Sequence, residues 1–325
     1  MTPTPPILIT MGDPVGIGPE IIVRAFRDGA ADGCVVVGDS SVMLRALKLV
    51  DWPSSMAVLD HPLQPAPPGC LPVWEPAQSD ADLYSLPWGE VHASAGEAAA
   101  GCIIAAARAV LQGEGAGLVT APINKAALAA AGLTQPGHTE MLQVLAGGVP
   151  VRMMLANEEL RVVLVTIHQS LRSAIDAVTF DAVLQTLRIA HASGYGRRIA
   201  VAGLNPHAGE GGLFGDEEQR IIGPAVAAAR AEGIDAHGPF APDTVFMRAR
   251  RGEFELVVAM THDHGLIPVK YLGVEQGVNV TLGLPFVRTS PDHGTAFDIA
   301  GQGVADASSL KAAIRWARRA IAIPR

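Results

Sequence analysis

The segment "ELVVAMTHDHG" (255–265) joins a short, largely apolar run to a cluster of polar and ionisable residues. A continuous apolar run is typical of a strand covered on both faces, because a strand with one solvated face alternates apolar and polar residues. Helices that pack on both sides of a parallel sheet provide such cover. The segment therefore predicts an α/β fold in which His262, Asp263 and His264 follow the carboxyl end of a buried strand.

Similar apolar runs recur along the chain, at 7–11, 34–38, 117–121, 161–167 and 199–204. Ala-rich segments with helical character are interspersed with them, at 95–112, 179–193, 217–232 and 308–322. This alternation predicts a mostly parallel sheet with helices on both faces. The segment 53–80, rich in Pro and Ser, is predicted to be an irregular excursion.

The composition limits the class of protein. A chain of 325 residues, 49% of them hydrophobic, is long enough for two domains. The net charge of −8, with no basic stripe, argues against a nucleic-acid partner. Three separated cysteines suit a reducing compartment. No signal-peptide pattern is evident, and the uncharged stretch 98–107 is too short to span a bilayer, so we expect a cytoplasmic protein without membrane contact.

Polar or ionisable residues follow five of the six predicted strands. They occur in the segments that begin at Gly12, Pro122, His168, Asn205 and His262. In open α/β sheets the carboxyl ends of the strands converge on the ligand site, and the amino ends of helices direct their N–H groups into it. This edge of the sheet is therefore the predicted active site.

Three histidines, His168, His207 and His262, each come at or just after the end of a separate strand. Three neutral imidazoles are a common ligand set for a catalytic divalent metal, and they leave positions open for substrate oxygens. Each histidine alone is also compatible with a strand cap that bonds to backbone. Residue types and spacing leave both interpretations open.

Further segments contain groups suited to anions. "GHTEML" (137–142) places His138 and Thr139 at a predicted helix start, where amides and a hydroxyl suit phosphate or carboxylate, although Thr139 could equally be a helix cap. Lys270, Asn279 and Arg288 lie nine residues apart and together could hold a phosphate and a carboxylate. "GDPVGIGPEII" (12–22) is either an anion-binding loop or a structural turn into a helix.

The chain resembles the 4-hydroxythreonine-4-phosphate dehydrogenase family over essentially its full length. The resemblance is carried, in order, by the motifs "GDPVGIGPE", "TAPINK", "GHTEML", "LNPHAGEGGLFGDEE", "GPFAPDTVF", "HDHGLIPVK" and "GVNVTLGLPFVRTSPDHGTAFDIAG". It implies two α/β domains of the isopropylmalate dehydrogenase type with the active-site cleft between them. The first domain would comprise 1–130 plus 285–325, with the nucleotide-binding loop, and the second 131–284, with the metal and substrate loops and the dimer contacts.

The resemblance also implies roles for individual residues. The metal ligands are His168, His207 and His262, in a site shared across a homodimer. Catalytic roles fall to Asp243 and Lys270, and the metal is Zn, Mg, Co or Mn. Substrate is bound by His138, Thr139, Lys270, Asn279 and Arg288. The cofactor NAD, with NADP as the alternative, is bound by Asp292, His293, Gly294, Thr295 and Asp298.

The implied substrate is a small phosphorylated hydroxy acid, 4-phosphooxy-L-threonine. Its oxidation gives 2-amino-3-oxo-4-phosphooxybutanoate, a β-keto acid that loses carbon dioxide to form 3-amino-2-oxopropyl phosphate in pyridoxal phosphate biosynthesis. Asp298 matches the position where relatives place an acidic residue on the adenosine ribose. A carboxylate there repels a 2′-phosphate, so NAD is expected to be preferred over NADP.

Four residues depart from the commonest family pattern, namely Thr261, His264, Leu213 and Pro242. All four are expected beside the site, so they bear on the substrate more than on the chemistry. One alternative is a paralogous dehydrogenase for 4-phospho-D-threonate, 4-phospho-D-erythronate or another secondary-alcohol acid. Others are a metal-dependent phosphatase, which leaves the 292–301 motif unused, and a dinucleotide-binding regulator, which has no use for the histidines.

Overall fold

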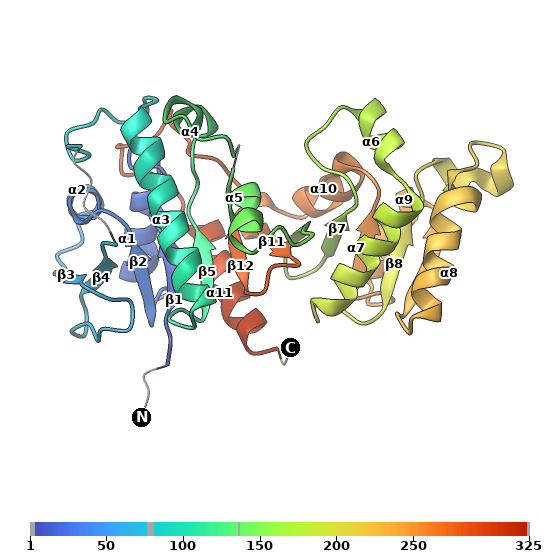
Figure 1. Ribbon diagram of the computed structural model, residues 1–325, viewed down its shortest axis with the longest axis horizontal. Helices are drawn as coiled ribbons and strands as arrows, with labels where there is room; N and C mark the ends of the chain where they lie inside the picture. The colour runs from blue at the N-terminus through green and yellow to red at the C-terminus, as the bar shows by residue number, and fades with distance from the viewer. Residues whose placement is uncertain (1–3, 77–80, 136, 324–325) are drawn as a thin grey trace. The chain divides into compact units, whose positions relative to one another are not determined.

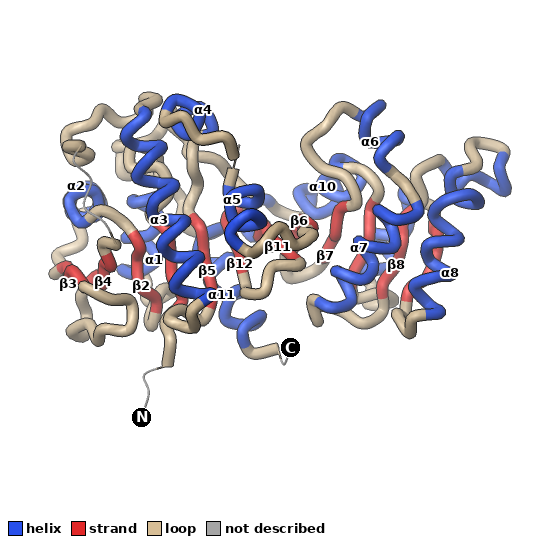
Figure 2. The backbone as a smooth tube through the Cα atoms, viewed as in Figure 1, coloured by secondary structure: helices blue, strands red, loops and turns tan. Residues whose placement is uncertain are grey.

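The computed structural model describes residues 4–76, 81–135 and 137–323, and it divides into two compact units (Figures 1 and 2). The first unit runs to Pro150 and resumes over Leu284–Ala322. The second comprises Val151–Gly283 together with Ile323. Both units consist of a sheet with helices, so the predicted mixed α/β class is confirmed.

The described residues of the first unit form six strands in the order β3-β4-β2-β1-β5-β12, and neighbouring strands run parallel. Their runs are short and mostly buried, which is the pattern expected of a parallel sheet covered by helices. The strands are β1 (Ile7–Thr10), β2 (Cys34–Val37), β3 (Met56–Leu59), β4 (Leu71–Trp74), β5 (Gly117–Thr120) and β12 (Arg288–Pro291).

The described residues of this unit form six helices, of which α4 and α5 pack on α3. The longest, α3, lies against β1, β2 and β5, while α11 packs on β5 and β12 and also meets α1. The chain thus reaches the centre of the unit from both of its ends. The helices are α1 (Gly18–Arg27), α2 (Ser40–Val50), α3 (Ala93–Leu111), α4 (Lys125–Ala130), α5 (His138–Leu145) and α11 (Ser308–Ile321).

The second unit has the strand order β11-β6-β7-β10-β8-β9. β7, β10, β8 and β9 run parallel, whereas β6 is antiparallel to both β7 and β11. Its core forms around Leu164, Val257 and Phe246. The strands are β6 (Arg152–Ala156), β7 (Arg161–Leu164), β8 (Ile199–Ala202), β9 (Ala236–Phe240), β10 (Leu256–Ala259) and β11 (Val278–Leu282).

The helical segments of the second unit follow its strands. They include a single π-helical turn, η2 (Glu218–Ile222), and a 3-10 turn, η3 (Val274–Gln276). The segment η1 (Pro206–Gly212) contains turns, but its φ/ψ values over residues 207–211 are not those of a right-handed helix. The α-helices are α6 (Leu171–Ala177), α7 (Phe180–Ala192), α8 (Gly223–Ala231), α9 (Pro242–Arg250) and α10 (His262–Tyr271).

Two local predictions were wrong. The segment 53–80 is not wholly irregular, because it contains β3 and β4; residues 77–80 lie outside the described part. The motif that begins at His262 forms helix α10, where no helix was predicted, although it contains Gly265 and Pro268. Gly265 is required there because a Cβ atom would lie 2.4 Å from Leu164 Cδ2, so the helix packs directly on β7.

The boundary between the units also differs from the one expected at residue 130. The compact units change over between Pro150 and Val151, and again between Gly283 and Leu284. The first unit extends to Pro150, beyond the expected residue 130, because α5 packs against α3 and so belongs with the first sheet.

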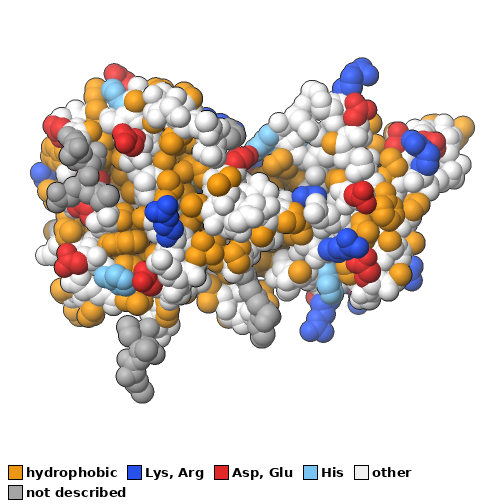
Figure 3. Space-filling model, in the orientation of Figure 1, with side chains coloured by type: hydrophobic (Ala, Val, Ile, Leu, Met, Phe, Trp, Pro, Cys, Tyr) orange, Lys and Arg blue, Asp and Glu red, His pale blue; other side chains and the backbone are white. Residues whose placement is uncertain are grey.

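Helix α3 is, within the described residues, the one helix long and apolar enough to cross a membrane by length and composition, and 56% of its most apolar stretch is buried inside the structure. Such burial is typical of a core helix. On the face drawn in Figure 3, Lys and Arg side chains are dispersed among acidic ones and form no basic stripe.

Candidate functional site

The second unit brings the ends of three neighbouring parallel strands together at one edge. β10 pairs with β7 on one side and with β8 on the other. His168 follows β7, His262 follows β10 and His207 follows β8, so the three predicted ligands occupy adjacent positions along this edge.

His168 and His262 lie close together. Their ring centroids are 5.7 Å apart, with the ring planes tilted by 46°. His262 is the first residue of α10, and its Nδ1–H donates to Asp263 Oδ1 at 2.8 Å. A carboxylate on Nδ1 orients an imidazole so that Nε2 presents its lone pair, as is usual for metal-ligating histidines. The pair therefore has the donor chemistry of two ligands to one ion.

His207 is placed differently. It lies in η1 with a left-handed backbone (φ 52°) and its ring is 6.1 Å from that of Phe214. No group of three or more His, Cys, Asp or Glu side chains suited to a metal is found among the described residues of a single chain. The structure thus pairs His168 with His262 but does not add His207 to them.

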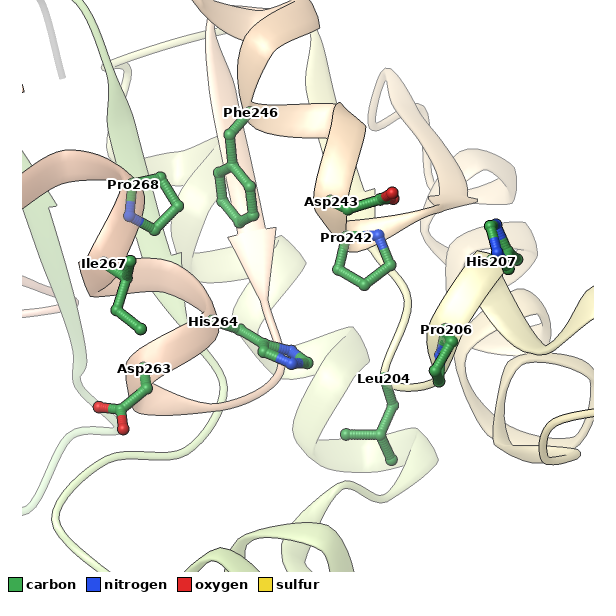
Figure 4. Close-up of a pocket in the computed structure, with 10 residues that line it drawn as sticks. All are labelled: Leu204, Pro206, His207, Pro242, Asp243, Phe246, Asp263, His264, Ile267 and Pro268. Carbon is green, nitrogen blue, oxygen red and sulfur yellow. The ribbon is translucent and has the colours of Figure 1, made fainter. Parts of the chain in front are cut away.

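A pocket of about 550 Å³ opens beside His207 (Figure 4). In the figure the His264 ring points into it, the Asp243 carboxylate is directed toward His207, and Asp263 points away. His264 Nδ1 is shielded from solvent and has no hydrogen-bond partner among the described residues. The lining comes from the β8 loop (Leu204, Pro206, His207), α9 (Pro242, Asp243, Phe246) and α10 (Asp263, His264, Ile267, Pro268).

Two of the residues that depart from the family pattern, His264 and Pro242, therefore line one pocket. Leu213 instead is 72% exposed, and Thr261 is buried immediately before α10. Of the four residues that differ from the commonest family pattern, Pro242 on α9 and His264 on α10 are thus the two that can contact a ligand in this pocket.

The remaining anion-binding candidates of this unit lie further along the chain. Lys270 is exposed in the last turn of α10, and Asn279 is half-buried in β11. The carbonyl of Val269 accepts from Asn157 Nδ2 at 3.3 Å, which fixes the end of the helix that carries Lys270.

In the first unit, the buried Arg288 lies near the half-buried His138. Arg288 Nη2 donates to Thr120 Oγ1 at 2.6 Å, and burial lowers the pKa of this guanidinium to about 10, against the opposing charge of Glu140. Burial also lowers the pKa of His138 well below 6.5, assisted by the charge of Arg288 and opposed by a hydrogen bond with the Ala121 backbone. At neutral pH this pair is thus a cationic arginine beside a neutral imidazole.

His138 and its neighbour form the first turn of α5. His138 Nε2 is shielded and has no hydrogen-bond partner among the described residues, and Thr139 is half-buried. A buried cation with an unused imidazole nitrogen and a helix amino terminus is suited to a phosphate or carboxylate group.

The predicted nucleotide loop packs on the loop after β1. Ile17 N–H donates to the Thr295 carbonyl at 3.0 Å, and a Cβ at Gly16 would lie 3.0 Å from Thr295 Cβ. Asp13 lies buried in the same turn; its Oδ1 accepts from the Val15 N–H, and burial raises its pKa. Within this loop Thr295 is buried and Asp292 is half-buried. The exposed residues are His293, Gly294 and Asp298.

Sequence reasoning missed two residues that hold these loops. Arg45 donates to the carbonyls of Pro14, Tyr84 and Leu86 at 2.7–2.8 Å, and Glu218 binds the loop that carries His207. The signal at Glu218 is the acidic run 216–218, which is also an ordinary pattern for a helix start.

Comparison with known proteins shows extensive similarity. The sequence pattern of the family described as "Pyridoxal phosphate biosynthetic protein PdxA" matches residues 30–317. The 4-hydroxythreonine-4-phosphate dehydrogenase of Beijerinckia indica subsp. indica is 54% identical over 324 residues, covering 97% of this chain and 94% of that protein. The D-threonate 4-phosphate dehydrogenase of Pectobacterium atrosepticum is 45% identical over 321 residues, covering 96% and 98%.

A solved structure is similar over the same extent. The crystal structure of 4-hydroxythreonine-4-phosphate dehydrogenase from Klebsiella pneumoniae superposes with a TM-score of 0.91 at 45% identity, covering 98% of each chain.

Proposed function

Since the chain belongs to the PdxA family of pyridoxal phosphate biosynthetic proteins, we propose that it oxidises 4-phosphooxy-L-threonine with NAD and a divalent metal. Family membership makes the chain a dehydrogenase that acts on a CH–OH group. The specific substrate, cofactor and metal are our proposal. The observation that carries it is the pair of strand-end sites, an anion site in the first unit and a histidine edge in the second.

The first unit supplies the contacts to substrate anions. Arg288 retains its charge at neutral pH, because its pKa of about 10 is still well above 7. His138 is neutral there and offers Nε2, while Thr139 adds a hydroxyl at the start of α5. In our proposal these groups bind the phosphate or carboxylate of the substrate, and we also propose Lys270 and Asn279 as substrate-binding residues.

The second unit supplies the metal ligands. In our proposal His168 and His262 are two of the metal ligands and His207 is the third residue of the set. We propose that the site is shared across a homodimer, so that one of the three positions is filled by a histidine of the partner subunit. A divalent metal held by these histidines would lower the pKa of a coordinated substrate hydroxyl, and NAD held by the 292–298 loop would take up the hydride from the adjacent carbon. Imidazole ligands suit Zn, Co or Mn, with Mg as a weaker fit.

Catalytic roles are assigned to Asp243 and Lys270. Asp243 lines the pocket beside His207 and supplies a carboxylate that can accept the hydroxyl proton. Lys270, with its helix end fixed by Asn157, holds a substrate anion. The 3-oxo product is a β-keto acid, which loses carbon dioxide to give 3-amino-2-oxopropyl phosphate.

The loop from Asp292 to Asp298 is our proposed NAD contact. It follows β12 at a strand carboxyl end, it packs on the loop that leads into α1, and Asp298 is exposed. Relatives that act on a metabolic phosphate ester are consistent with a cytoplasmic enzyme, which is our proposal for its location.

A specific alternative is oxidation of 4-phospho-D-threonate, because proteins named for that reaction are 44–46% identical to this chain. Both reactions use the same anion site and strand edge. They differ at carbon 2, which carries an ammonium group in one substrate and a hydroxyl in the other.

One assay tests the proposal. The protein is incubated with NAD, zinc or magnesium, and in turn with 4-phospho-L-threonine, 4-phospho-D-threonate and 4-phospho-D-erythronate, and NADH is followed by absorbance. We expect the highest kcat/KM with 4-phospho-L-threonine. A higher value with 4-phospho-D-threonate would transfer the assignment to the alternative, and phosphate release without NADH would indicate a phosphatase.

A further inference from the structure

The loop that carries His207 has a backbone that few residues adopt unaided. His207, Ala208, Gly209, Glu210 and Gly211 have φ values of 52°, 52°, 81°, 44° and 67° in succession. Three of the five are not glycine. A run of left-handed residues persists only where the surrounding structure determines it, because the Cβ atom of each L-residue crowds its own carbonyl oxygen.

The group that holds this loop is the carboxylate of Glu218. Its residue is only 4% exposed and begins the π-helical turn η2. Oε1 accepts from the backbone N–H groups of Leu204 and Asn205, both at 2.7 Å, and Oε2 accepts from Asn205 Nδ2 at 2.9 Å. Asn205 Nδ2 also donates to Glu217 Oε2 at 2.7 Å.

Two glycines give the carboxylate access to the loop from both sides of His207. A Cβ at Gly203 would lie 2.9 Å from Glu218 Oε1, and a Cβ at Gly209 would lie 2.8 Å from Oε2. Both distances are closer than carbon and oxygen normally approach. The loop is therefore built around this one side chain, at residues before and after the histidine.

We propose that Glu218 is the positioning residue of His207. It does not contact substrate or cofactor; it fixes the backbone from Gly203 to Gly209, and so sets where the His207 ring stands beside the pocket of Figure 4. The role of His207 as a ligand rests on the proposed function, whereas the contact between Glu218 and the loop is a property of the structure alone.

The first test replaces Glu218→Gln in the full-length protein, with Asp216→Asn as the matched control. The amide oxygen of the new side chain can still accept from the backbone N–H groups of Leu204 and Asn205. Its amide nitrogen, however, faces Asn205 Nδ2, so two hydrogen-bond donors meet and that hydrogen bond is lost. Asp216 is exposed in the same segment and its side chain pairs with Arg220, so the control removes a charge without touching the loop.

Amide hydrogen exchange of the peptide covering 203–212 is measured in the metal-free proteins. We expect it to be at least tenfold faster in Glu218→Gln than in wild type, and unchanged in Asp216→Asn, with the remaining peptides of both variants unaffected. Equal exchange in the 203–212 peptide of Glu218→Gln and wild type would overturn the proposal.

The second readout is the affinity for Co²⁺, followed by titration calorimetry on the metal-free proteins. We expect Glu218→Gln to bind about 10–100-fold more weakly, as is usual when a group supporting a ligand is lost, and Asp216→Asn to bind as wild type does. A loosened loop with unchanged Co²⁺ affinity would show that Glu218 does not position His207. If wild type binds no Co²⁺, the proposed metal function fails, and the exchange result alone decides the role of Glu218.

A compensating substitution at Asn205 distinguishes the loss of these hydrogen bonds from a general destabilisation of the protein. Adding Asn205→Asp to the Glu217→Gln/Glu218→Gln double variant gives both amide nitrogens an acceptor and restores the donor–acceptor order. We expect the triple variant to recover most of the slow exchange and of the Co²⁺ affinity that the double variant loses. Failure to recover either would count against the hydrogen-bond arrangement described here.

Discussion

The protonation of Arg288 and His138 depends on their burial and on the charges near them. Burial lowers the pKa of Arg288 and is opposed by the charge of Glu140, whereas the pKa of His138 is lowered by burial and also by the charge of Arg288. The arginine remains protonated at neutral pH and the histidine does not. The pair therefore presents one cation with a polar, uncharged neighbour, which is suited to a substrate that carries a mixture of phosphate and hydroxyl groups.

The lowered pKa of His138 has a consequence for stability. Because the folded state disfavours the imidazolium, the unfolded state binds more protons once the pH falls below about 6.5. Stability contributed by the neutral form is present above that pH and is lost as the pH falls toward the lower pKa of the folded state. We expect His138→Gln to reduce the slope of unfolding free energy against pH by up to about 1.4 kcal/mol per pH unit.

Urea unfolding at pH 7, 6 and 5 measures this slope. The control is His191→Gln, since His191 is an exposed histidine in the last turn of α7. Wild type and the control should have parallel profiles. If His138→Gln follows them between pH 6 and 5, the histidine is not held neutral.

For His168 and His262, at the strand ends of the second unit, we expect a substitution to change activity and not stability. His262 is 40% exposed at its side chain and contacts His168, so its truncation removes little packing. We expect His262→Ala to abolish metal-dependent NADH formation while the Tm shifts by no more than about 2 °C, in line with a surface substitution. Full turnover in this variant, measured at saturating metal, would remove His262 from the site.

Asp298 bears on cofactor choice. Its exposed carboxylate is expected to accept from the ribose hydroxyls of NAD and to repel the 2′-phosphate of NADP. Asp298→Ala should lower the ratio of kcat/KM for NAD to that for NADP by about tenfold, which corresponds to about 1.4 kcal/mol. The ratio is measured with one substrate held at saturation, and an unchanged ratio means that another residue selects the cofactor.

At the residue scale, the sequence indicated where the site would be but not how its members pair. Strand ends could be read from apolar runs, so the placement of His168, His262 and His207 at the ends of strands was predictable, whereas the order β7-β10-β8 that makes them neighbours was not. The grouping of two histidines rather than three was not, and neither was Glu218. Each of these depends on side-chain directions and loop conformation, which residue spacing alone does not specify.

Secondary-structure elements were predictable in proportion to their apolar length. Buried strands such as β8 and β10 read clearly, whereas β9 ("AHGPF") and β12 ("RTSP") contain Pro and polar residues and carry no apolar run. Their pairing comes from neighbouring strands. Helix α10 was missed because Gly265 and Pro268 are usual loop markers, although here the glycine lets the helix lie directly on β7.

Helix α3 offers a sharp test of packing between elements. A Cβ at Gly96 would lie 2.2 Å from the Ala127 carbonyl oxygen, so α3 and α4 touch through this glycine. Gly101, on the same helix, has nothing within 4 Å of its Cβ position. We expect Gly96→Ala to lower the unfolding free energy by about 3 kcal/mol, and Gly101→Ala to raise it by about 0.5–1 kcal/mol.

Chemical denaturation of the two variants measures both effects. Because both changes add the same methyl group to one helix, any difference between them reports the contact with α4 and not helix propensity. Equal stability of the two variants would mean that the two helices do not approach as closely as described.

On the scale of the whole molecule, the two units differ in how the chain builds them. The second unit is almost one continuous segment, 151–283, whereas the first needs both chain ends. Its two parts are linked by buried hydrogen bonds, from Ala305 N–H to Glu20 Oε1 at 2.8 Å and from Ile17 N–H to the Thr295 carbonyl at 3.0 Å. The mixed α/β class was predictable from the sequence, but the extent of the first unit beyond residue 130 required the contact of α5 with α3.

This asymmetry predicts the behaviour of fragments. A fragment of residues 151–283 retains all six strands of the second sheet and should unfold cooperatively in urea. A fragment of residues 1–150 lacks β12 and α11, which cover β5, and should show no cooperative transition. Adding a peptide of residues 284–325 should restore one. A cooperative transition of 1–150 alone would contradict the assignment of α11 to its core.

The split first unit also sets an order of events during synthesis. When residue 150 leaves the ribosome, β5 is paired with β1 but still lacks its other neighbour, β12, which follows only after residues 151–283 have been made. At about 5–20 residues per second the interval is on the order of ten seconds. The amino-terminal part of the first unit is incomplete during that time, so we expect its apolar strands to be exposed to chaperones until residues 284–322 have been made.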